Sequence, residues 1–327
     1  MPDAIHWGIL GTGAIAKKFA TALQSLPEAR LVAVGSRTKV KADEFGAEYK
    51  VPHRHGSYES LVNDAEADAV YVATPHSCHK ENALAALTAG KPVLVEKPFT
   101  INAIEAESVI KLARTKKLLL MEAMWTRYLP LYAKLRQMLA EGVIGEVRML
   151  TSDFGFKARP DSNRRLFEPA LGGGALLDVG VYPVSLASMI FGPPSQVTGA
   201  AQLGPTGVDE QSAMVLTHRD GQLAVLWCAI TVDTPQEASL MGTNGRIRIH
   251  APFWKATTMT LTRQGRKEEE LGLPFTGNGY QCEAAEFMSC LRADKLESAV
   301  MPLAETVAIM KTLDTLRAQW GLKYPME

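Results

Sequence analysis

The sequence predicts two domains: an α/β domain built on a doubly wound parallel sheet, then an α+β domain with an open, mostly antiparallel sheet. From Ile5 to about Met121, short β-branched runs alternate with helical stretches, which is the pattern of parallel βαβ units. After Glu122 the sequence changes to longer strand candidates joined by short turns. Because 327 residues exceed the usual size of one hydrophobic core, we expect domains at residues 1–122 and 123–327.

The first domain contains five strand candidates with helices between them. The strand candidates are Ile5–Leu10, Leu31–Val34, Ala69–Ala73, Val93–Val95 and Leu118–Met121. One helix candidate, Lys80–Thr88, is followed by Gly90 and Pro92, two residues that end helices. This alternation predicts the doubly wound sheet.

The second domain begins with a helix candidate, Leu131–Glu141, and a strand candidate from Glu146 to about Phe154. Three glycines at 172–174 precede a strongly apolar helix, Ala175–Phe191, which Gly192-Pro193-Pro194 ends. Asp220-Gly221 and Asn244-Gly245 are two-residue hairpin signals between four strand candidates: Ala213–Thr217, Leu223–Cys228, Ala238–Gly242 and Arg246–His250. Two helices follow, at about Gln281–Arg292 with Asn278 as its expected N-cap and at Leu303–Trp320, and we expect that the C-terminal helix can pack back on the first domain.

The composition is that of an ordinary globular protein, with 46% hydrophobic and 21% charged residues. Because 35 basic residues balance 35 acidic ones, charge gives no reason to expect nucleic acid or a membrane as partner. No run of 18 unbroken apolar residues and no basic leader is present, so we expect neither a membrane span nor export. The four cysteines lack CxxC spacing, which indicates reduced thiols in the cytoplasm and no zinc site: Cys78, Cys228, Cys282 and Cys290.

The first strand candidate leads directly into Gly11-Thr12-Gly13-Ala14-Ile15-Ala16 and then into a helix. This strand–turn–helix context is the one in which such a loop binds a dinucleotide. Gly11 allows the tight turn, Gly13 lets the backbone approach a pyrophosphate, and the small Ala16 lets the helix pack closely on the strand. A glycine-containing turn that binds nothing is the alternative. The sequence therefore predicts a Rossmann domain, with the phosphates at the helix N-terminus.

The end of the second strand indicates which dinucleotide binds. NAD enzymes usually present an Asp or Glu there to the ribose hydroxyls. This chain has Ser36 and Arg37, followed by Thr38-Lys39. A hydroxyl and a guanidinium suit a 2′-phosphate, so NADP is favoured over NAD. The alternative is that the basic side chains only solvate a helix start.

Lys97 is the first candidate for the chemistry. It lies in Glu96-Lys97-Pro98, directly after the strand candidate Val93–Val95, at the carboxyl edge where open α/β sheets place their ligands. A solvated loop lysine is the alternative reading. A cis bond before Pro98 would fix the direction of the lysine.

Asp178 and Tyr182 interrupt the apolar helix and are four residues apart, so we expect them on one helical face. A buried carboxylate needs a partner, and a lysine of the other domain would place Lys97, Asp178 and Tyr182 around one cleft. A phenol has a reference pKa of about 10, which a nearby ammonium lowers. Tyr182 and Lys97 are therefore a workable acid–base pair for interconverting an alcohol and a ketone. The alternative is that Tyr182 packs at a domain interface and Asp178 caps a neighbouring backbone.

Three segments together resemble the glucose–fructose oxidoreductase/inositol dehydrogenase/rhizopine catabolism (Gfo/Idh/MocA) family over essentially the whole chain. They are residues 11–16, 96–98 and 172–182. Residues 121–128, with tyrosine rather than histidine at position 182, are most similar to the dihydrodiol dehydrogenase branch, which includes NADP-dependent D-xylose dehydrogenases. The resemblance implies a catalytic lysine at Lys97, an acid at Asp178, a proton donor or acceptor at Tyr182, and a C-terminal sheet that often forms a dimer interface.

Other residues are assigned to the site by their positions. Trp125, Arg127 and Tyr128 lie just past the domain junction and are candidates for substrate binding, with packing roles as the alternative. Thr74, Pro75, His76 and His79 follow the strand ending at Ala73 and are expected beside the cofactor with Glu96; HxxH without a third ligand does not predict a metal. His53 and His55 are expected at the surface.

The sequence thus predicts a cytoplasmic NADP-dependent dehydrogenase, a homodimer or higher homo-oligomer, acting on a ring carbon of a sugar or cyclic diol. One alternative is an NADPH-dependent reductase of a keto-sugar, anhydro-sugar or dicarbonyl. Another, from a different class, is an NADP-binding sensor without turnover.

Overall fold

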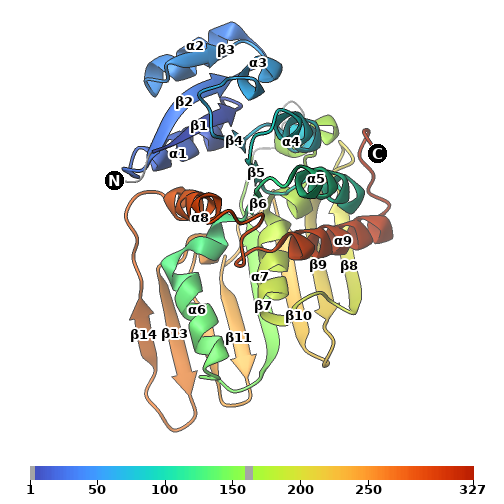
Figure 1. Cartoon of the computed structure of the whole chain (residues 1–327). Helices are drawn as coiled ribbons and strands as arrows, with labels where there is room; N and C mark the ends of the chain where they lie inside the picture. The colour runs from blue at the N-terminus through green and yellow to red at the C-terminus, as the bar shows by residue number, and fades with distance from the viewer. Residues whose placement is uncertain (1–3, 159–164) are drawn as a thin grey trace. The chain divides into compact units, whose positions relative to one another are not determined.

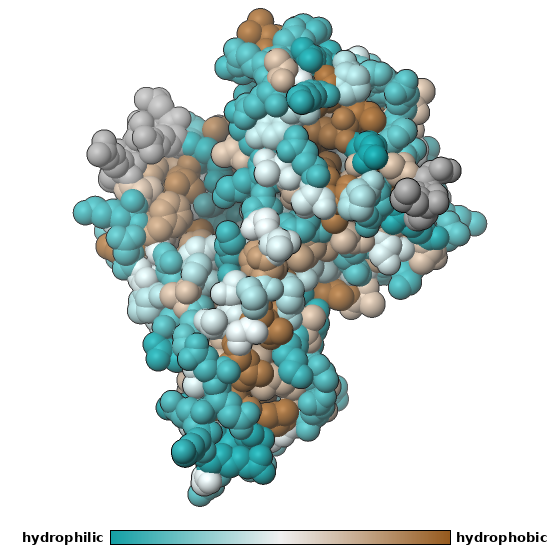
Figure 2. Space-filling model, turned by 90° about the vertical axis from the view of Figure 1, so that its left-hand side faces the viewer, coloured by the Kyte–Doolittle hydropathy of each residue, from teal (hydrophilic) through white to brown (hydrophobic). Residues whose placement is uncertain are grey.

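The computed structural model describes residues 4–158 and 165–327 (Figure 1). The chain forms two compact units. Unit 1 is Met1–Trp125 with Thr276–Thr306, and unit 2 is Thr126–Phe275 with Val307–Glu327. The predicted fold class is confirmed, because a parallel α/β sheet is followed by a mostly antiparallel one. Figure 2 shows hydrophobic side chains in patches among hydrophilic ones on one face, as is usual for a protein surface.

Unit 1 contains a six-stranded parallel sheet with the order β3-β2-β1-β4-β5-β6. Its strands are β1 Ile5–Leu10, β2 Ala29–Gly35, β3 His53–His55, β4 Ala69–Val72, β5 Val93–Glu96 and β6 Leu120–Ala123. The strand order reverses between β1 and β4, and in such sheets ligands bind at the carboxyl ends next to that point. The strand β3 has only three polar residues, so the sequence did not predict it.

Six α-helices belong to unit 1: α1 Ala14–Leu23, α2 Lys39–Glu48, α3 Tyr58–Val62, α4 His79–Thr88, α5 Ala103–Lys116 and α8 Tyr280–Arg292. Helix α8 returns from late in the sequence to pack against α1. Aromatic rings join the two helices to the sheet, because Trp7 contacts both Phe19 and Phe287, and Phe19 stacks on Tyr71 with 3.8 Å between ring centroids. The expected N-cap of α8 was wrong: Gly279 is the N-cap, although the Asn278 side chain accepts a hydrogen bond from the Tyr280 amide.

Unit 2 contains an eight-stranded sheet with the order β14-β13-β12-β11-β7-β10-β9-β8. All neighbours are antiparallel except β7 and β10. The strands are β7 Val147–Gly155, β8 Gln196–Leu203, β9 Asp209–Thr217, β10 Leu223–Ala229, β11 Ala238–Gly242, β12 Gly245–Ile249, β13 Thr258–Arg263 and β14 Glu269–Gly272. Its α-helices are α6 Pro130–Ala140, α7 Val181–Phe191 and most of α9 Leu303–Trp320.

Both predicted hairpins of unit 2 are antiparallel strand pairs, but neither has the expected two-residue loop at the expected place. In the first, Thr217 pairs with Leu223, so residues 218–222 lie between the paired positions. In the second, Gly242 pairs with Gly245, so the two loop residues are Thr243 and Asn244, one position earlier than expected. In β10, Ala224, Leu226 and Cys228 are buried, whereas the alternate residues are half-buried. One face of the sheet therefore carries the core and the other is partly open.

The segment Pro169–Phe191 is long and apolar enough to cross a membrane by length and composition. However, 83% of its most apolar 18-residue window is buried inside the protein. A helix that is buried on all sides in the core is hydrophobic all round, which explains the nearly uniform hydrophobicity of residues 175–191.

Candidate active site

The glycine loop between β1 and α1 has the geometry that a dinucleotide requires. Gly11 has φ of +106°, and a Cβ atom there would lie 2.5 Å from the Ala73 carbonyl oxygen, so only glycine fits. A Cβ on Gly13 would meet no atom of residues 4–158 or 165–327 within 4 Å, which leaves room beside the loop. Ala16 is completely buried where α1 packs on the sheet.

The N-terminus of α1 is free to receive an anion. Its N-cap, Gly13, has no side chain to cap the first amide groups, and no acidic residue lies in the first turn. The amides of the first turn, beginning at Ala14 and Ile15, have no partners within the helix and carry its positive end. Thr12 is half-buried beside them. These residues fit a pyrophosphate.

Ser36 and Arg37 lie at the carboxyl end of β2, as predicted. Ser36 is buried, and its amide donates to the His55 carbonyl oxygen at 3.1 Å. Arg37 is exposed and makes no ion pair within the described residues, whereas nearby Lys39 pairs with Asp43. Arg37 is thus the available guanidinium at this strand end, which suits a 2′-phosphate.

His79 lies in the interior of unit 1. It is completely buried, and its ring nitrogens contact the carbonyl oxygens of Thr74 at 2.9 Å and Pro98 at 2.8 Å. The ring thus joins the loops after β4 and β5, and its place beside the cofactor stays a prediction. Thr74 also accepts from Asn82 at 3.0 Å, and His76 is 5% exposed. Pro75 is half-buried in the same loop.

Lys97 follows β5, and the peptide bond between Lys97 and Pro98 is cis. Its amide donates to the Glu96 carboxylate at 3.1 Å. The other oxygen of that carboxylate accepts a hydrogen bond from the hydroxyl of Tyr71 on β4. Glu96 is 4% exposed and holds the lysine backbone from inside the sheet, and its place beside the cofactor stays a prediction.

Glu283 on α8 is a residue that the sequence reasoning missed. It is completely buried, and neither carboxyl oxygen has a hydrogen-bond partner within the described residues. Burial first, and then the negative charge of Glu96, raises the pKa of the Glu283 carboxyl well above its ordinary value. A glutamate in an amphipathic helix is usually exposed, so the sequence of α8 did not indicate that Glu283 is buried. Its burial results from the packing of α8 in unit 1.

Asp178 lies in a π-helical turn, Leu176–Gly180, that precedes α7. The expected α-helical spacing to Tyr182 was therefore wrong: Pro183 has no amide N–H, so the α-helical hydrogen bonds are interrupted here. Asp178 accepts a hydrogen bond from Arg165 at 2.6 Å. Its carboxylate thus has an arginine partner within its own unit, which the sequence did not predict.

Tyr182 lies in the first turn of α7 and is 6% exposed. Its ring lies 5.4 Å from that of Phe154 on β7, and Phe154 stacks on Trp254 at 3.5 Å. Sequence reasoning named Phe154 only as a strand end and assigned neither it nor Trp254 to the site, because a lone aromatic residue is indistinguishable from core. Together the rings form an apolar wall beside the phenol.

Two of the three candidates for substrate binding have structural roles. Arg127 is 2% exposed, and its guanidinium donates to the Ser185 hydroxyl at 3.0 Å and carbonyl at 2.6 Å. Trp125 is 4% exposed and stacks on Tyr280 at 4.6 Å. The charged group of Arg127 thus binds α7, and its role in substrate binding stays a prediction. The Trp125 ring is likewise covered on one face, and the Tyr128 hydroxyl is enclosed.

Fold and loop geometry together define a two-unit oxidoreductase of the Rossmann class. Residues 5–124 match the oxidoreductase family with an NAD-binding Rossmann fold, and residues 132–248 match the Gfo/Idh/MocA C-terminal domain. The chain belongs to the Gfo/Idh/MocA family. It is 35% identical to trans-1,2-dihydrobenzene-1,2-diol dehydrogenase of Mus musculus over 99% of both chains. The enzymes of that name from Homo sapiens and Xenopus tropicalis are each 34% identical, over 99% of both chains and over 98% and 100%, respectively.

Solved structures show the same fold. A 3-ketoreductase from Actinomadura kijaniata, in complex with NADP and TDP-benzene, superposes with a TM-score of 0.87 at 27% identity, over 97% of this chain and 98% of that one. An aldose-aldose oxidoreductase from Caulobacter crescentus has a TM-score of 0.87 at 22% identity, covering 95% and 96% of the two chains. At that identity the likeness concerns the fold alone.

Proposed function

We propose that this protein is an NADP-dependent oxidoreductase that transfers a hydride between the nicotinamide and a ring carbon of a sugar or cyclic vicinal diol, of the D-xylose or trans-dihydrodiol type. The proposal rests on what each unit contains by itself. Unit 1 has the open glycine loop, Arg37 and the fixed Lys97, and unit 2 has Asp178 and Tyr182 beside an aromatic wall. The diol dehydrogenase relatives and the NADP-bound ketoreductase support it.

In this proposal the dinucleotide-binding domain is residues 1–122 and the substrate domain is residues 123–327. The first turn of α1 and residues 11–15 bind the pyrophosphate, Ser36 and Arg37 bind the 2′-phosphate, and residues 74–76 with Lys97 bind the nicotinamide end. The bound NADP supplies the hydride acceptor.

The proton moves at the Tyr182 hydroxyl. Its phenolic oxygen accepts the proton of the substrate hydroxyl during oxidation and returns it during reduction. The Lys97 ammonium stabilises the phenolate, and Asp178 binds a neighbouring hydroxyl or orients the pair. Phe154 and Trp254 present apolar faces suited to a sugar or diol ring and exclude water.

The test is a panel of pentoses and cyclic diols, with NADP⁺ and NAD⁺ side by side, on the native protein and on Tyr182→Phe. We expect kcat/KM of the variant to fall by about 100-fold or more, since positioned acid–base groups contribute that much. The Kd for NADP⁺ should stay unchanged. Tyr49→Phe, on a half-buried tyrosine at the end of α2, is the matched control. Full activity in Tyr182→Phe would remove this tyrosine from the mechanism.

A second candidate is an NADPH-dependent reductase of a keto-sugar, anhydro-sugar or dicarbonyl, which the Actinomadura kijaniata 3-ketoreductase favours. Crystal structures of that enzyme also exist with a lysine replaced by alanine or glutamate and with a tyrosine replaced by phenylalanine. The same proton transfer at Tyr182 serves this direction. Turnover of carbonyl substrates with NADPH, without oxidation of diols, would select it. Tight NADPH binding without any turnover would favour a sensor instead.

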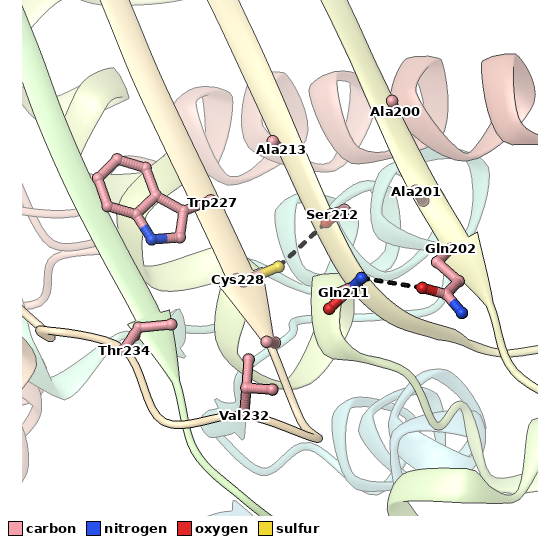
Figure 3. Close-up of a pocket in the computed structure, with 11 residues that line it drawn as sticks. Ala200, Ala201, Gln202, Gln211, Ser212, Ala213, Trp227, Cys228, Val232 and Thr234 are labelled. Atoms are coloured by element: carbon pink, nitrogen blue, oxygen red, sulfur yellow. Dashed lines mark hydrogen bonds between the residues drawn. The ribbon is translucent and has the colours of Figure 1, made fainter.

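A homodimer formed through the open face of the unit 2 sheet is part of the proposal. The strands β8, β9 and β10 border a pocket of about 470 Å³, and Trp227 is one of the residues that line it (Figure 3). Val215 and Met149 are 41% and 37% exposed on the sheet. Apolar groups in such a patch favour burial against a second copy. Light scattering should give twice the chain mass, and Val215→Asp should shift it toward monomer; a native monomer at micromolar concentration would contradict the dimer.

A cytoplasmic location also belongs to the proposal. All four cysteines are free, which fits a reducing compartment. Fractionation of cells that express the untagged protein tests this: recovery with a cytoplasmic marker is expected, and recovery in a secreted or membrane fraction would contradict it.

A further inference from the structure

The histidines of Pro52-His53-Arg54-His55 have no part in the proposed function. Because they are two residues apart on β3, their side chains point to the same side of the strand. Asp64, just after α3, faces them. His53 Nδ1 lies 2.7 Å and His55 Nε2 2.8 Å from the same oxygen, Asp64 Oδ2. Both histidines are half-buried; the sequence placed them at the surface but did not indicate that they contact Asp64.

The aspartate is held in place by contacts that leave this oxygen to the histidines. Asp64 Oδ1 accepts the Glu66 amide at 2.9 Å, and the Asp64 carbonyl accepts from Lys91 at 2.8 Å. The side chain of Asp64 is 5% exposed, whereas those of His53 and His55 are 33% and 18% exposed. The cluster thus has a rigid inner ligand and a side that water and ions can reach.

The outer nitrogen of each imidazole also faces an oxygen. His55 Nδ1 lies 2.7 Å from Ser60 Oγ, and His53 Nε2 lies 3.6 Å from Glu66 Oε2. An imidazole bound to a metal carries its proton on the outer nitrogen and donates it to such an oxygen, which fixes the tautomer and the ring orientation. Both inner nitrogens can then direct their lone pairs to one point.

We propose that His53, His55 and Asp64 form a binding site for a divalent transition metal of the zinc class, with water completing the coordination. Two imidazoles and a carboxylate suit Zn²⁺, Co²⁺ or Ni²⁺, whereas Mg²⁺ and Ca²⁺ prefer oxygen ligands only. The three ligand atoms lie within 4.8 Å of one another. When the ion binds, each neutral imidazole carries its one proton on the outer nitrogen, so no proton remains between the histidines and Asp64. Tetrahedral zinc separates its ligand atoms by about 3.4 Å, so each inner nitrogen moves roughly 0.6 Å further from the Asp64 oxygen.

The consequence for the fold is local. The strand β3 is a three-residue edge strand that pairs only with β2, and the ion ties it to the segment after α3. A ligand that binds only the folded state stabilises that state. The site is independent of the proposed oxidoreductase activity, so either proposal can fail without the other.

The test is isothermal titration of chelator-treated full-length protein with ZnCl₂. We expect one equivalent to bind at micromolar concentration and to raise the Tm. His53→Gln/His55→Gln should weaken binding about 100-fold or more, and Ser60→Ala about 10-fold, because outer partners of metal-bound histidines contribute 10–100-fold. The matched control, His250→Gln, replaces a histidine whose ring contacts Thr260, and should bind as the native protein does.

Co²⁺ absorption distinguishes this cluster from the cysteines. A His₂Asp site gives d–d bands without the thiolate charge-transfer band that a cysteine ligand produces. Loss of these bands in the double variant, with NADP⁺ binding and circular dichroism unchanged, supports the site. No binding at micromolar Zn²⁺, equal binding in the double variant, or a thiolate band would overturn it.

Discussion

The buried guanidinium of Arg127 binds α7, the helix that carries Tyr182. Its donors bind the hydroxyl and the carbonyl of Ser185, one turn after Tyr182 on α7. We expect Arg127→Met to lower the free energy of unfolding by about 2–4 kcal/mol, because it removes charge-assisted bonds and leaves a buried carbonyl unpaired. Urea denaturation measures this.

The control for Arg127 is Arg148→Met, which removes a guanidinium that is 55% exposed and pairs with Glu146. Exposed pairs contribute at most about 1 kcal/mol, so this variant should unfold nearly as the native protein does. If Arg127→Met kept full stability but raised KM for the substrate more than tenfold, the arginine would be a substrate ligand after all.

Glu283 is expected to be a neutral carboxylic acid at pH 7, because burial and Glu96 both disfavour its charge. Infrared difference spectra between the native protein and Glu283→Gln should therefore show the carbonyl stretch of a protonated acid. The amide is a neutral isostere, so the variant should fold and bind NADP⁺ as before. A difference spectrum with carboxylate bands only would contradict this, and Glu286→Gln on the same helix is the control.

The sequence indicated which residues the candidate site contains, but it did not indicate which residues form hydrogen bonds with them. The sequence indicated that the acid at 178 needs a cation, but its observed partner in unit 2 is Arg165, thirteen residues earlier. Likewise, HxxH was placed correctly after β4, yet the burial of His79 depends on the loop after β5. Such contacts arise from folding and have no local pattern.

At the scale of elements, prediction succeeded where periodicity was strong. The strand β1 and the helix α9 begin and end where the sequence indicated, and α6 begins one residue earlier. It failed at the π-helical turn before α7, because an apolar run has no period from which a widened turn can be read. At the glycine loop, the tight turn at Gly11 and the helix that follows it were predicted correctly, since these residue types follow from backbone geometry.

The two glycines of that loop give opposite predictions. Gly11→Ala should be destabilised, because its Cβ would meet the Ala73 carbonyl at 2.5 Å and φ is +106°. Gly13→Ala should keep its stability, since its Cβ meets nothing within 4 Å, but should bind NADP⁺ at least about tenfold more weakly by entering the space proposed for the pyrophosphate. Thermal unfolding and fluorescence titration separate the two effects.

If Gly13→Ala bound NADP⁺ with native affinity, the glycine loop would not be part of the cofactor site. Gly90→Ala is the control for backbone strain, because φ there is +82° while no atom lies within 4 Å. It should lose stability without losing affinity for NADP⁺.

At the scale of the whole chain, the sequence indicated two sheets and their order but not how the chain is divided between the units. Residues Thr276–Thr306 return to unit 1, where Thr306 donates to Glu122 at 2.8 Å and the Leu296 carbonyl accepts from Leu120 at 3.1 Å. The parallel pairing of β7 with β10 was likewise unpredicted. Both are long-range contacts, which hydrophobic pattern alone does not specify.

The stability of unit 2 should depend on pH through Asp209. This residue is completely buried, with one carboxyl oxygen accepting the Leu176 amide at 2.6 Å, and burial raises its pKa to about 7. A carboxyl group whose pKa is raised on folding contributes stability that is fully present below its unfolded pKa, about 4, and is lost as the pH rises through 7. Asp209→Asn carries no charge at any pH and can still accept the Leu176 amide.

The free energy of unfolding of Asp209→Asn minus that of the native protein should therefore increase between pH 4 and pH 8, by at most about 4 kcal/mol. Carboxyl groups with lowered pKa, such as Glu48 and Asp64, lose stability as the pH falls, but they are the same in both proteins and cancel in the difference. Urea denaturation at pH 4.5, 6 and 8 measures it. A difference that stays constant across this range would mean that Asp209 is already ionised in the folded protein, with its charge compensated by Arg317, the cation that lowers its pKa.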